Sequence, residues 1–329
     1  MNPSDYVIGF DLGGTRLKSG AVTRAGRIRA AGVMPSGYGM VPKKLLKAYR
    51  DEIKRIAGAM GEQPKAIGLA FSGAVDPRKG VVFLPGKVKG LEGFPIVELL
   101  EDAAGVPVIA DNDGRISMYA EATYGAAKDH AWAMTITIGT GVGSGVRLDG
   151  KILRDPHLQF GTQMSHIVQQ SNQGHLCITG ARGTAEMLCS ATALAMSVRN
   201  ALQRGIESSL SDAYFKDPTS VDFKRVMQAV ERGDRLCRDE LDRWIEQLGW
   251  LLVSAVHVYA PEIIILCGGA TLAADQFLEP LRQHVNRHIF RYPVGEPVPI
   301  VISNLSDHMG VLGTAARAWE WVGSLDRTS

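Results

Sequence analysis

Two glycine-rich segments hold many of the residues whose types and spacing suggest chemistry. The first runs Asp11-Leu-Gly13-Gly14-Thr15 and lies between two strand-like runs, 6–10 and 17–22. Glycine has no Cβ, so backbone N–H groups there can approach a phosphate closely. Thr15 adds a hydroxyl donor, and Asp11 can hold a hydrated Mg²⁺ beside that phosphate. An ordinary tight hairpin with an acidic first residue is the alternative interpretation of this segment alone.

The second segment, 139–145, has glycine at every other position, with Thr140 and Ser144 between them. It fits neither the dinucleotide-binding fingerprint nor the P-loop pattern. Alone it is also compatible with a structural turn. Two such hairpins, each between strands, together favour a nucleotide phosphate held between two lobes.

Asn112 and Asp113 stand where a strand-like run passes into a helical segment. A carboxylate at such a junction can accept the proton of an attacking hydroxyl group. Asn and Asp are also the residues that usually cap a helix N-terminus. The pattern alone leaves a general base and a helix cap both open.

Strand-like and helical segments mix along the chain in the order of an α/β protein, and 329 residues favour about two domains. The polar stretch 205–219 is interpreted as a surface excursion between helices. Expected strands are 6–10, 17–22, 27–34, 67–72, 106–110, 132–138, 145–148, 263–266 and 298–302. Expected helices are 45–60, 96–104, 113–124, 185–196, 223–232, 237–258, 277–288 and 310–321.

Composition excludes several classes of protein. Lys plus Arg number 36 and Asp plus Glu 34, so the charge balance gives no case for nucleic-acid binding. The longest apolar run, 248–260, is too short to span a membrane and contains His257. The polar first five residues show no secretory signal. The four cysteines, 177, 189, 237 and 267, do not form a disulfide framework, so we expect a reducing, cytoplasmic setting.

The order of several motifs resembles the ROK family (repressor, open reading frame, kinase). These motifs are D-x-G-G-T, N-D, G-T-G-x-G-S-G, a histidine, C-x-x-G-x-x-G-x-x-E and a late C-G-G. The resemblance extends from Tyr6 to the last helix. It implies a two-lobed α/β fold of the actin/hexokinase-like (ribonuclease H-like) type, as in ATP-dependent sugar kinases. The implied lobes are residues 1–112 plus the C-terminal helix 310–329, and residues 113–309.

The resemblance also implies a site. Asp113 matches the catalytic base, which accepts the proton of a sugar hydroxyl, most naturally the 6-OH of a hexose or hexose derivative. ATP is the implied phosphoryl donor, with Mg²⁺ near Asp11. The ATP-binding residues are Asp11, Gly13, Gly14 and Thr15, then Gly139, Thr140, Gly141 and Gly143, and Gly268 and Gly269 on the adenosine side. The sugar-binding residues are Ser72, Gly73, Asn112, Asp113, Gln163, His166 and Glu186.

Partners follow from the same resemblance. It implies a small-molecule sugar substrate and a homodimer formed through the larger lobe. The family's repressors carry a helix-turn-helix segment before the first phosphate hairpin, and here ten residues precede Asp11. We therefore expect no nucleic-acid partner, and we expect no membrane partner.

The zinc motif of the family is only partly present. That motif supplies one histidine and three cysteines, but here only His166 and Cys177 match. Thr179 and Thr184 stand where the other two cysteines belong, and Cys189 is a poor substitute. Two soft ligands do not hold a structural zinc ion. We therefore expect no structural zinc, with the two hydroxyls hydrogen-bonded inside the loop instead.

The sugar side departs from the family as well. Gln163 replaces a glutamate, Arg115 replaces an asparagine, and Lys87 lies in the loop beside the sugar. One hypothesis is an anionic or atypical sugar paired with Arg115 or Lys87. The other is drift at residues that never touch the ligand, or Arg115 turned to solvent. The identity of the sugar and the range of phosphate donors stay open. A catalytically silent sugar sensor and a kinase for a non-sugar acceptor are the alternative functions.

Overall fold

A computed structural model describes residues 5–13, 16–36, 41–73, 75–76, 80–82, 90–154, 163–172, 174–290 and 296–325. The chain divides into two compact units. Unit 1 comprises Met1–Ala131, Gly145–Thr162 and Ser303–Ser329. Unit 2 comprises Trp132–Ser144 and Gln163–Ile302.

Unit 1 is built on a five-stranded sheet in the order β3-β2-β1-β4-β7. The strands are β1 (Tyr6–Leu12), β2 (Arg16–Thr23), β3 (Ile28–Pro35), β4 (Ile67–Phe71) and β7 (Val108–Asn112). The first three form an antiparallel meander, while β1, β4 and β7 are parallel. Two short strands, β5 (Val75–Asp76) and β6 (Val81–Val82), pair with each other.

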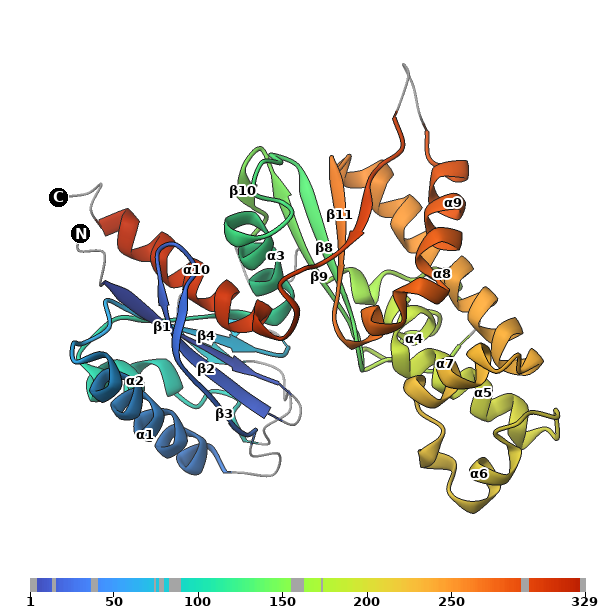
Figure 1. Cartoon of the computed structure of the whole chain (residues 1–329), viewed down its shortest axis with the longest axis horizontal. Helices are drawn as coiled ribbons and strands as arrows, with labels where there is room; N and C mark the ends of the chain where they lie inside the picture. The colour runs from blue at the N-terminus through green and yellow to red at the C-terminus, as the bar shows by residue number, and fades with distance from the viewer. Residues whose placement is uncertain are drawn as a thin grey trace. The chain divides into compact units, whose positions relative to one another are not determined.

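Helices cover both faces of this sheet (Figure 1). On one face lie α1 (Pro42–Met60) and α2 (Ile96–Ala104), and on the other α3 (Asp113–Tyr124) and α10 (Met309–Leu325). Side chains along β1 contribute to the hydrophobic clusters on both faces of the sheet, because successive side chains of a strand point to opposite faces. Ile8 and Phe10 join the cluster with α1 and α2, and Val7 joins the cluster with α10.

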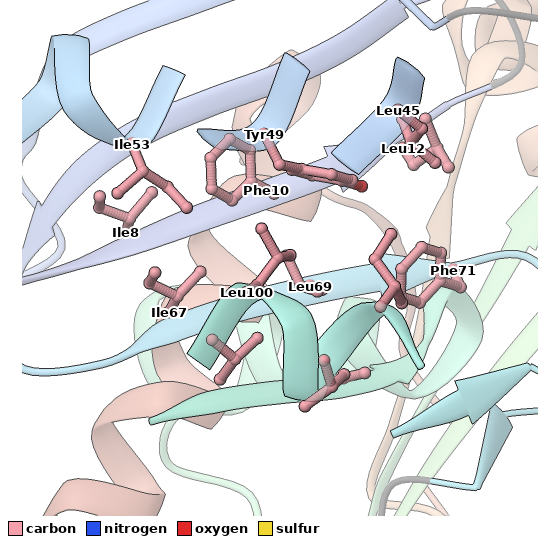
Figure 2. Close-up of a cluster of buried hydrophobic side chains, with 14 of the residues drawn as sticks. Ile8, Phe10, Leu12, Leu45, Tyr49, Ile53, Ile67, Leu69, Phe71 and Leu100 are labelled. Atoms are coloured by element: carbon pink, nitrogen blue, oxygen red, sulfur yellow. The ribbon is translucent and has the colours of Figure 1, made fainter. Parts of the chain in front are cut away.

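The larger of these clusters is shown in Figure 2, where side chains from β1, β4, α1 and α2 meet. Phe10 and Tyr49 pack edge to face, with ring centroids 4.8 Å apart. This dry layer fixes β1 and β4, and therefore the positions at which both strands end.

Unit 2 contains the central strands of a second sheet, ordered β10-β9-β8-β11-β12. These strands are β8 (Ala133–Ile138), β9 (Val142–Leu148), β10 (Lys151–Ile152), β11 (Ile263–Cys267) and β12 (Ile300–Ile302), and the division into units cuts β9 after Ser144. The helices are α4 (Ala185–Cys189), α5 (Ala191–Gln203), α6 (Ser211–Lys216), α7 (Phe223–Glu231), α8 (Arg235–Tyr259) and α9 (Leu278–His288).

Two details differ from the sequence expectations. The expected helix 185–196 is two helices, because Ser190 ends α4 and its hydroxyl caps α5 by accepting from the N–H of Ala193. The expected boundary after residue 112 falls instead after Ala131, so α3 groups with unit 1. The physical reason is that α3 packs closely along α10 at Gly313, where a Cβ would stand 2.1 Å from the carbonyl oxygen of Ile116.

No helix in the described ranges has the length and apolar character that a membrane crossing needs. The polar stretch 205–219 contains the short helix α6, none of whose residues is buried.

Candidate functional site

In unit 1, the parallel strands bring the predicted site residues to one edge of the sheet. Asp11 of β1 is in register with Ala70 of β4, and Phe71 of β4 with Asn112 of β7. Asp11, the Ser72–Gly73 turn and Asp113 therefore follow neighbouring strand ends. The carboxyl edge of a parallel sheet is the usual place for a ligand in α/β proteins.

Asp113 is the first residue of α3, and its side chain is exposed. The hydroxyl of Ser72 donates to its Oδ2 at 2.8 Å, and the N–H of Gly114 donates to its Oδ1 at 2.9 Å. The carboxylate is thus oriented by one donor on each oxygen while it remains open to a ligand. This is the arrangement that a general base requires.

Asn112 caps α3, which confirms the cap interpretation for this residue. Its Oδ1 accepts from the N–H of Gly114 at 2.9 Å, and its Nδ2 donates to the carbonyl of Gly73 at 2.8 Å. The side chain therefore ties the end of β7 to the turn after β4. A contact between Asn112 and a sugar remains a prediction.

Asp11 lies against the first turn of α10. A Cβ placed on Gly310 would stand 2.2 Å from the Asp11 Cγ, so only glycine fits there. On the other side, burial raises the pKa of Tyr49, and the charge of Asp11 raises it further. A carboxylate at this edge suits a hydrated Mg²⁺ ion, which prefers oxygen ligands.

Gly310 was not predicted as a site residue. The available signal is a glycine in the first turn of the last helix, a position where glycine weakens a helix without a packing reason. The first phosphate hairpin is described only in part. Gly13 donates its N–H to the carbonyl of Arg16 at 2.9 Å, while Gly14 and Thr15 lie outside the described residues.

In unit 2, two glycine turns meet at the carboxyl ends of β8 and β11, which are parallel neighbours. Gly268 has a φ of +90°, and a Cβ on it would lie 2.5 Å from the carbonyl oxygen of Ile138. The turn after β11 therefore packs directly against the start of the 139–141 turn. Gly269 has open space at its Cβ position, Thr140 is exposed, and Gly143 lies in β9.

Glu186 of α4 lies at the same glycine turn. Its Oε2 accepts from the N–H of Val142 at 3.3 Å, and a Cβ on Gly141 would stand 2.2 Å from that oxygen. The glycine at 141 leaves room for the carboxylate. The sequence placed Glu186 among the sugar ligands; the structure brings it to the second hairpin, and contact with a sugar remains a prediction.

His166 ends a short 3-10 turn, Met164–His166, that Gln163 precedes. The N–H of Met164 donates to the Ser144 hydroxyl at 3.3 Å, which ties this turn to β9. The Nδ1 atom of His166 is buried and has no hydrogen-bond partner among the residues the structure describes. A buried polar atom without a partner is costly, so a ligand that supplies one binds favourably there.

The loop that matches the zinc motif has threonines at two of the motif's four ligand positions. Cys177 Sγ and Thr179 Oγ1 are 2.9 Å apart, and Thr184 is fully buried in an isolated bridge to Val168. Burial raises the pKa of Cys177, but donors from Thr179 and the N–H of Ala181 outweigh it, so this pKa falls below its ordinary value. Within the described ranges, no three His, Cys, Asp or Glu side chains are grouped for a metal ion.

The expectation that Arg115 turns to solvent is wrong, because its side chain is fully buried. Its Nε donates to Asp111 Oδ1 at 2.7 Å. This arrangement agrees with the other part of that hypothesis, drift at a residue that never touches the ligand. The positive charge of Arg115 is paired with Asp111 inside the protein, so Arg115 gives no support to the hypothesis of an anionic sugar substrate. Lys87, the other residue of that hypothesis, lies outside the described residues.

Comparison with known proteins places this chain in a family. The chain is 30% identical to the glucokinase of Thermotoga maritima over 98% of this chain and 99% of that protein. It superimposes on the ROK hexokinase from Thermus thermophilus with a TM-score of 0.82, at 28% identity and over 97% and 99% of the two chains. A glucokinase from Streptomyces griseus, solved with glucose and AMPPNP, is similar in fold at a TM-score of 0.79 and 23% identity, over 96% and 99% of the two chains.

The family model for ROK proteins matches residues 7–320. This range takes in both glycine turns, the β7–α3 junction and all but the end of the last helix. The chain belongs to the ROK family, with the fold of the ROK hexokinases.

Proposed function

We propose that this protein is an ATP-dependent sugar kinase that phosphorylates the 6-OH of a hexose or hexose derivative. The observation that carries the proposal is the exposed Asp113 carboxylate, oriented by Ser72 and by the N–H of Gly114 at the end of β7. The names of two relatives with high coverage, a glucokinase and a ROK hexokinase, support the class of reaction.

The residues of unit 1 account for the acceptor side of the reaction. Asp113 accepts the proton of the attacking hydroxyl, and Ser72 holds the carboxylate in the orientation for this transfer. Asp11 is the residue that would hold Mg²⁺, an ion that neutralises charge on the transferred phosphoryl group. The N–H groups of the first glycine hairpin complete the phosphate contacts of this unit.

The residues of unit 2 account for the nucleotide and for sugar orientation. Gly139 and Gly269 have open space at their Cβ positions, and Thr140 between Gly139 and Gly141 is exposed, which suits phosphate and adenosine contacts. The buried Nδ1 of His166 has no hydrogen-bond partner among the described residues, and we assign it to a sugar hydroxyl. Glu186 and Gln163 are the further sugar ligands that we propose.

Two broader features belong to the same proposal. The four cysteines are free and buried, which supports a reducing, cytoplasmic setting. A homodimer through the larger lobe follows from the family resemblance, and sedimentation at several protein concentrations tests it.

The test is ADP release with Mg–ATP across neutral hexoses, N-acetylhexosamines, aminosugars and sugar acids. We expect turnover on a neutral hexose or a derivative, with a 6-phosphate ester as the product in phosphorus NMR. ATP binding without turnover on any sugar would favour the silent sensor. Turnover confined to a non-sugar alcohol would favour the third alternative.

A further inference from the structure

Asp111 is a buried acid next to the reacting residues, and neither phosphate binding nor proton transfer uses it. It lies in β7, two residues before Asp113, and its side chain is fully shielded from solvent. Three arginines surround its carboxylate: Arg115 of α3, Arg154 after β10 and Arg317 of α10. All four residues belong to unit 1.

Asp111 binds residues on both sides of Asp113 in the sequence. Its Oδ1 accepts the backbone N–H of Asn112 at 2.8 Å and the Nε of Arg115 at 2.7 Å. One of these donors lies immediately before Asp113 and the other two residues after it. A single carboxylate oxygen therefore fixes both ends of the short segment that carries Asp113.

The other oxygen of Asp111 ties this segment to the rest of unit 1. Oδ2 accepts from Arg154, and the Nε of Arg317 lies 3.8 Å away. Both guanidinium groups stand over the ring of Tyr119, at 5.6 and 5.8 Å from its centroid. The Tyr119 hydroxyl accepts from Arg154 at 2.9 Å and donates to Glu320 at 3.0 Å.

Stability alone does not explain this arrangement. A buried ion pair loses much of its Coulomb energy to desolvation, and well-packed apolar side chains are often as stabilising. Burial raises the pKa of Asp111, yet Arg115 and Arg154 outweigh it, so the carboxyl pKa lies below its ordinary value and the group stays charged. A charged, fully bonded carboxylate specifies one geometry of the backbone around it.

We propose that Asp111 is a positioning residue, which acts through Asn112 and Arg115 to hold the β7–α3 junction so that Asp113 meets the acceptor hydroxyl. The inference rests on the proposed function for its catalytic consequence. The claim that Asp111 holds the β7–α3 junction does not depend on the proposed function, because it concerns only the backbone of unit 1.

The test removes Asp111 together with Arg115, which is its fully buried partner. Arg154 and Arg317 remain, and both are partly exposed to solvent. The variant is Asp111→Asn with Arg115→Met. A second, milder variant is Arg154→Met, because Arg154 is 26% exposed and its loss is less of a risk to folding.

The matched control removes another buried acid with its arginine. Glu52 is 5% exposed and binds Arg55 at 2.7 Å, in α1 beside β2 and β3. This pair lies towards the sheet edge opposite to β7. The control variant is Glu52→Gln with Arg55→Met.

We expect the Asp111 pair variant to lower kcat by about 10- to 100-fold, with the KM for sugar and for Mg–ATP changed by no more than about threefold. The Arg154→Met change lowers kcat less, in the same direction. The control keeps kcat within about twofold of wild type, whatever its effect on the melting temperature.

Hydrogen exchange of the intact protein gives a readout that needs no activity. We expect the N–H groups of Asn112 and Gly114 to exchange faster in the Asp111 pair variant and to be unchanged in the control. Unchanged exchange of these N–H groups in the Asp111 pair variant, or a kcat of that variant equal to that of the control, overturns the proposal. If wild type phosphorylates no sugar, the proposed function fails, while hydrogen exchange still decides whether Asp111 holds the junction.

Discussion

Gly310 places the last helix directly against Asp11, the residue proposed to hold Mg²⁺, so its replacement by alanine disturbs a closely packed contact. An alanine Cβ at this position would stand 2.2 Å from the Cγ of Asp11 and 2.3 Å from its Oδ2. Carbon atoms in packed interiors stay at least about 3 Å apart, so the two groups must separate by roughly 1 Å. Either the Asp11 side chain leaves its position or the first turn of α10 shifts.

Both responses have a cost that can be measured. Overpacking of this kind destabilises a protein by about 1–3 kcal/mol. A displacement of about 1 Å at a catalytic group lowers turnover by about 100-fold. We therefore expect Gly310→Ala to lower the melting temperature by several degrees and to raise the Mg²⁺ concentration needed for half-maximal ADP release.

Gly323 provides the matched control on the same helix. Nothing lies within 4 Å of a Cβ built there. Gly323→Ala should keep wild-type activity and gain about 0.5–1 kcal/mol, because alanine is the better helix former. If Gly310→Ala behaved like Gly323→Ala in both melting temperature and Mg²⁺ dependence, the contact between Asp11 and α10 would not hold the site.

Three further predictions concern unit 2. Gly268→Ala should destabilise the protein by about 1–3 kcal/mol and weaken ATP binding, because a Cβ there meets the Ile138 carbonyl and because Gly268 has a φ of +90°. The control Gly269→Ala should melt at nearly the wild-type temperature, because the space at its Cβ position is open. Wild type should melt at the same temperature with and without a chelator. The double variant Thr179→Cys with Thr184→Cys should bind one zinc ion per chain by elemental analysis and lose stability when chelator is added. Zinc bound by wild type would contradict this reasoning. Burial raises the pKa of Asp234, but the N–H of Cys237 and the donors of Ser208 and Ser209 lower it to about 2. The charged carboxylate therefore stabilises the fold at pH values above its ordinary pKa, and this contribution is lost as the pH falls towards 2. Asp234→Asn should therefore be less stable than wild type near neutral pH, with the difference vanishing near pH 2 in acid unfolding curves; a constant difference at all pH values refutes the assignment.

Much of the architecture was predictable because it depends on local patterns. The α/β order, the meander that opens the chain and the long helix expected at 237–258 follow from hydrophobic periodicity and glycine positions, and the structure confirms them. The register of β1, β4 and β7 then brings Asp11 and Asp113 to one sheet edge. Strand order of this kind is typical of the fold that the motifs indicated.

The contacts that the sequence did not reveal are one local buried ion pair and several contacts between distant segments. Arg115 was interpreted as a sugar ligand, as a residue that never touches the ligand, or as a residue turned to solvent. Its burial was not predicted, since a charged side chain is rarely buried without a partner. Its partner, Asp111, is four residues away, and the other arginines of that cluster come from distant segments. Likewise, Gly310 matters only because α10 returns to β1, which no local pattern encodes.

Helix boundaries show the same limit on a smaller scale. Apolar spacing runs without interruption through 185–196, so the sequence predicted one helix. At the break, the Ser190 hydroxyl caps α5, and the Ser190 carbonyl accepts the indole N–H of Trp244 in α8 at 3.0 Å. A contact with a residue 54 positions away is invisible to helical periodicity.

Single-turnover phosphorylation by wild type, Asp113→Asn and Ser72→Ala tests the central claim most directly. With a sugar that wild type turns over, Asp113→Asn should bind sugar and ATP normally and lose about 10²- to 10⁴-fold in the rate of transfer. Ser72→Ala keeps the carboxylate but loses its 2.8 Å donor, and should lose less. A transfer rate for Asp113→Asn within a few-fold of wild type would contradict the assignment of Asp113 as the base.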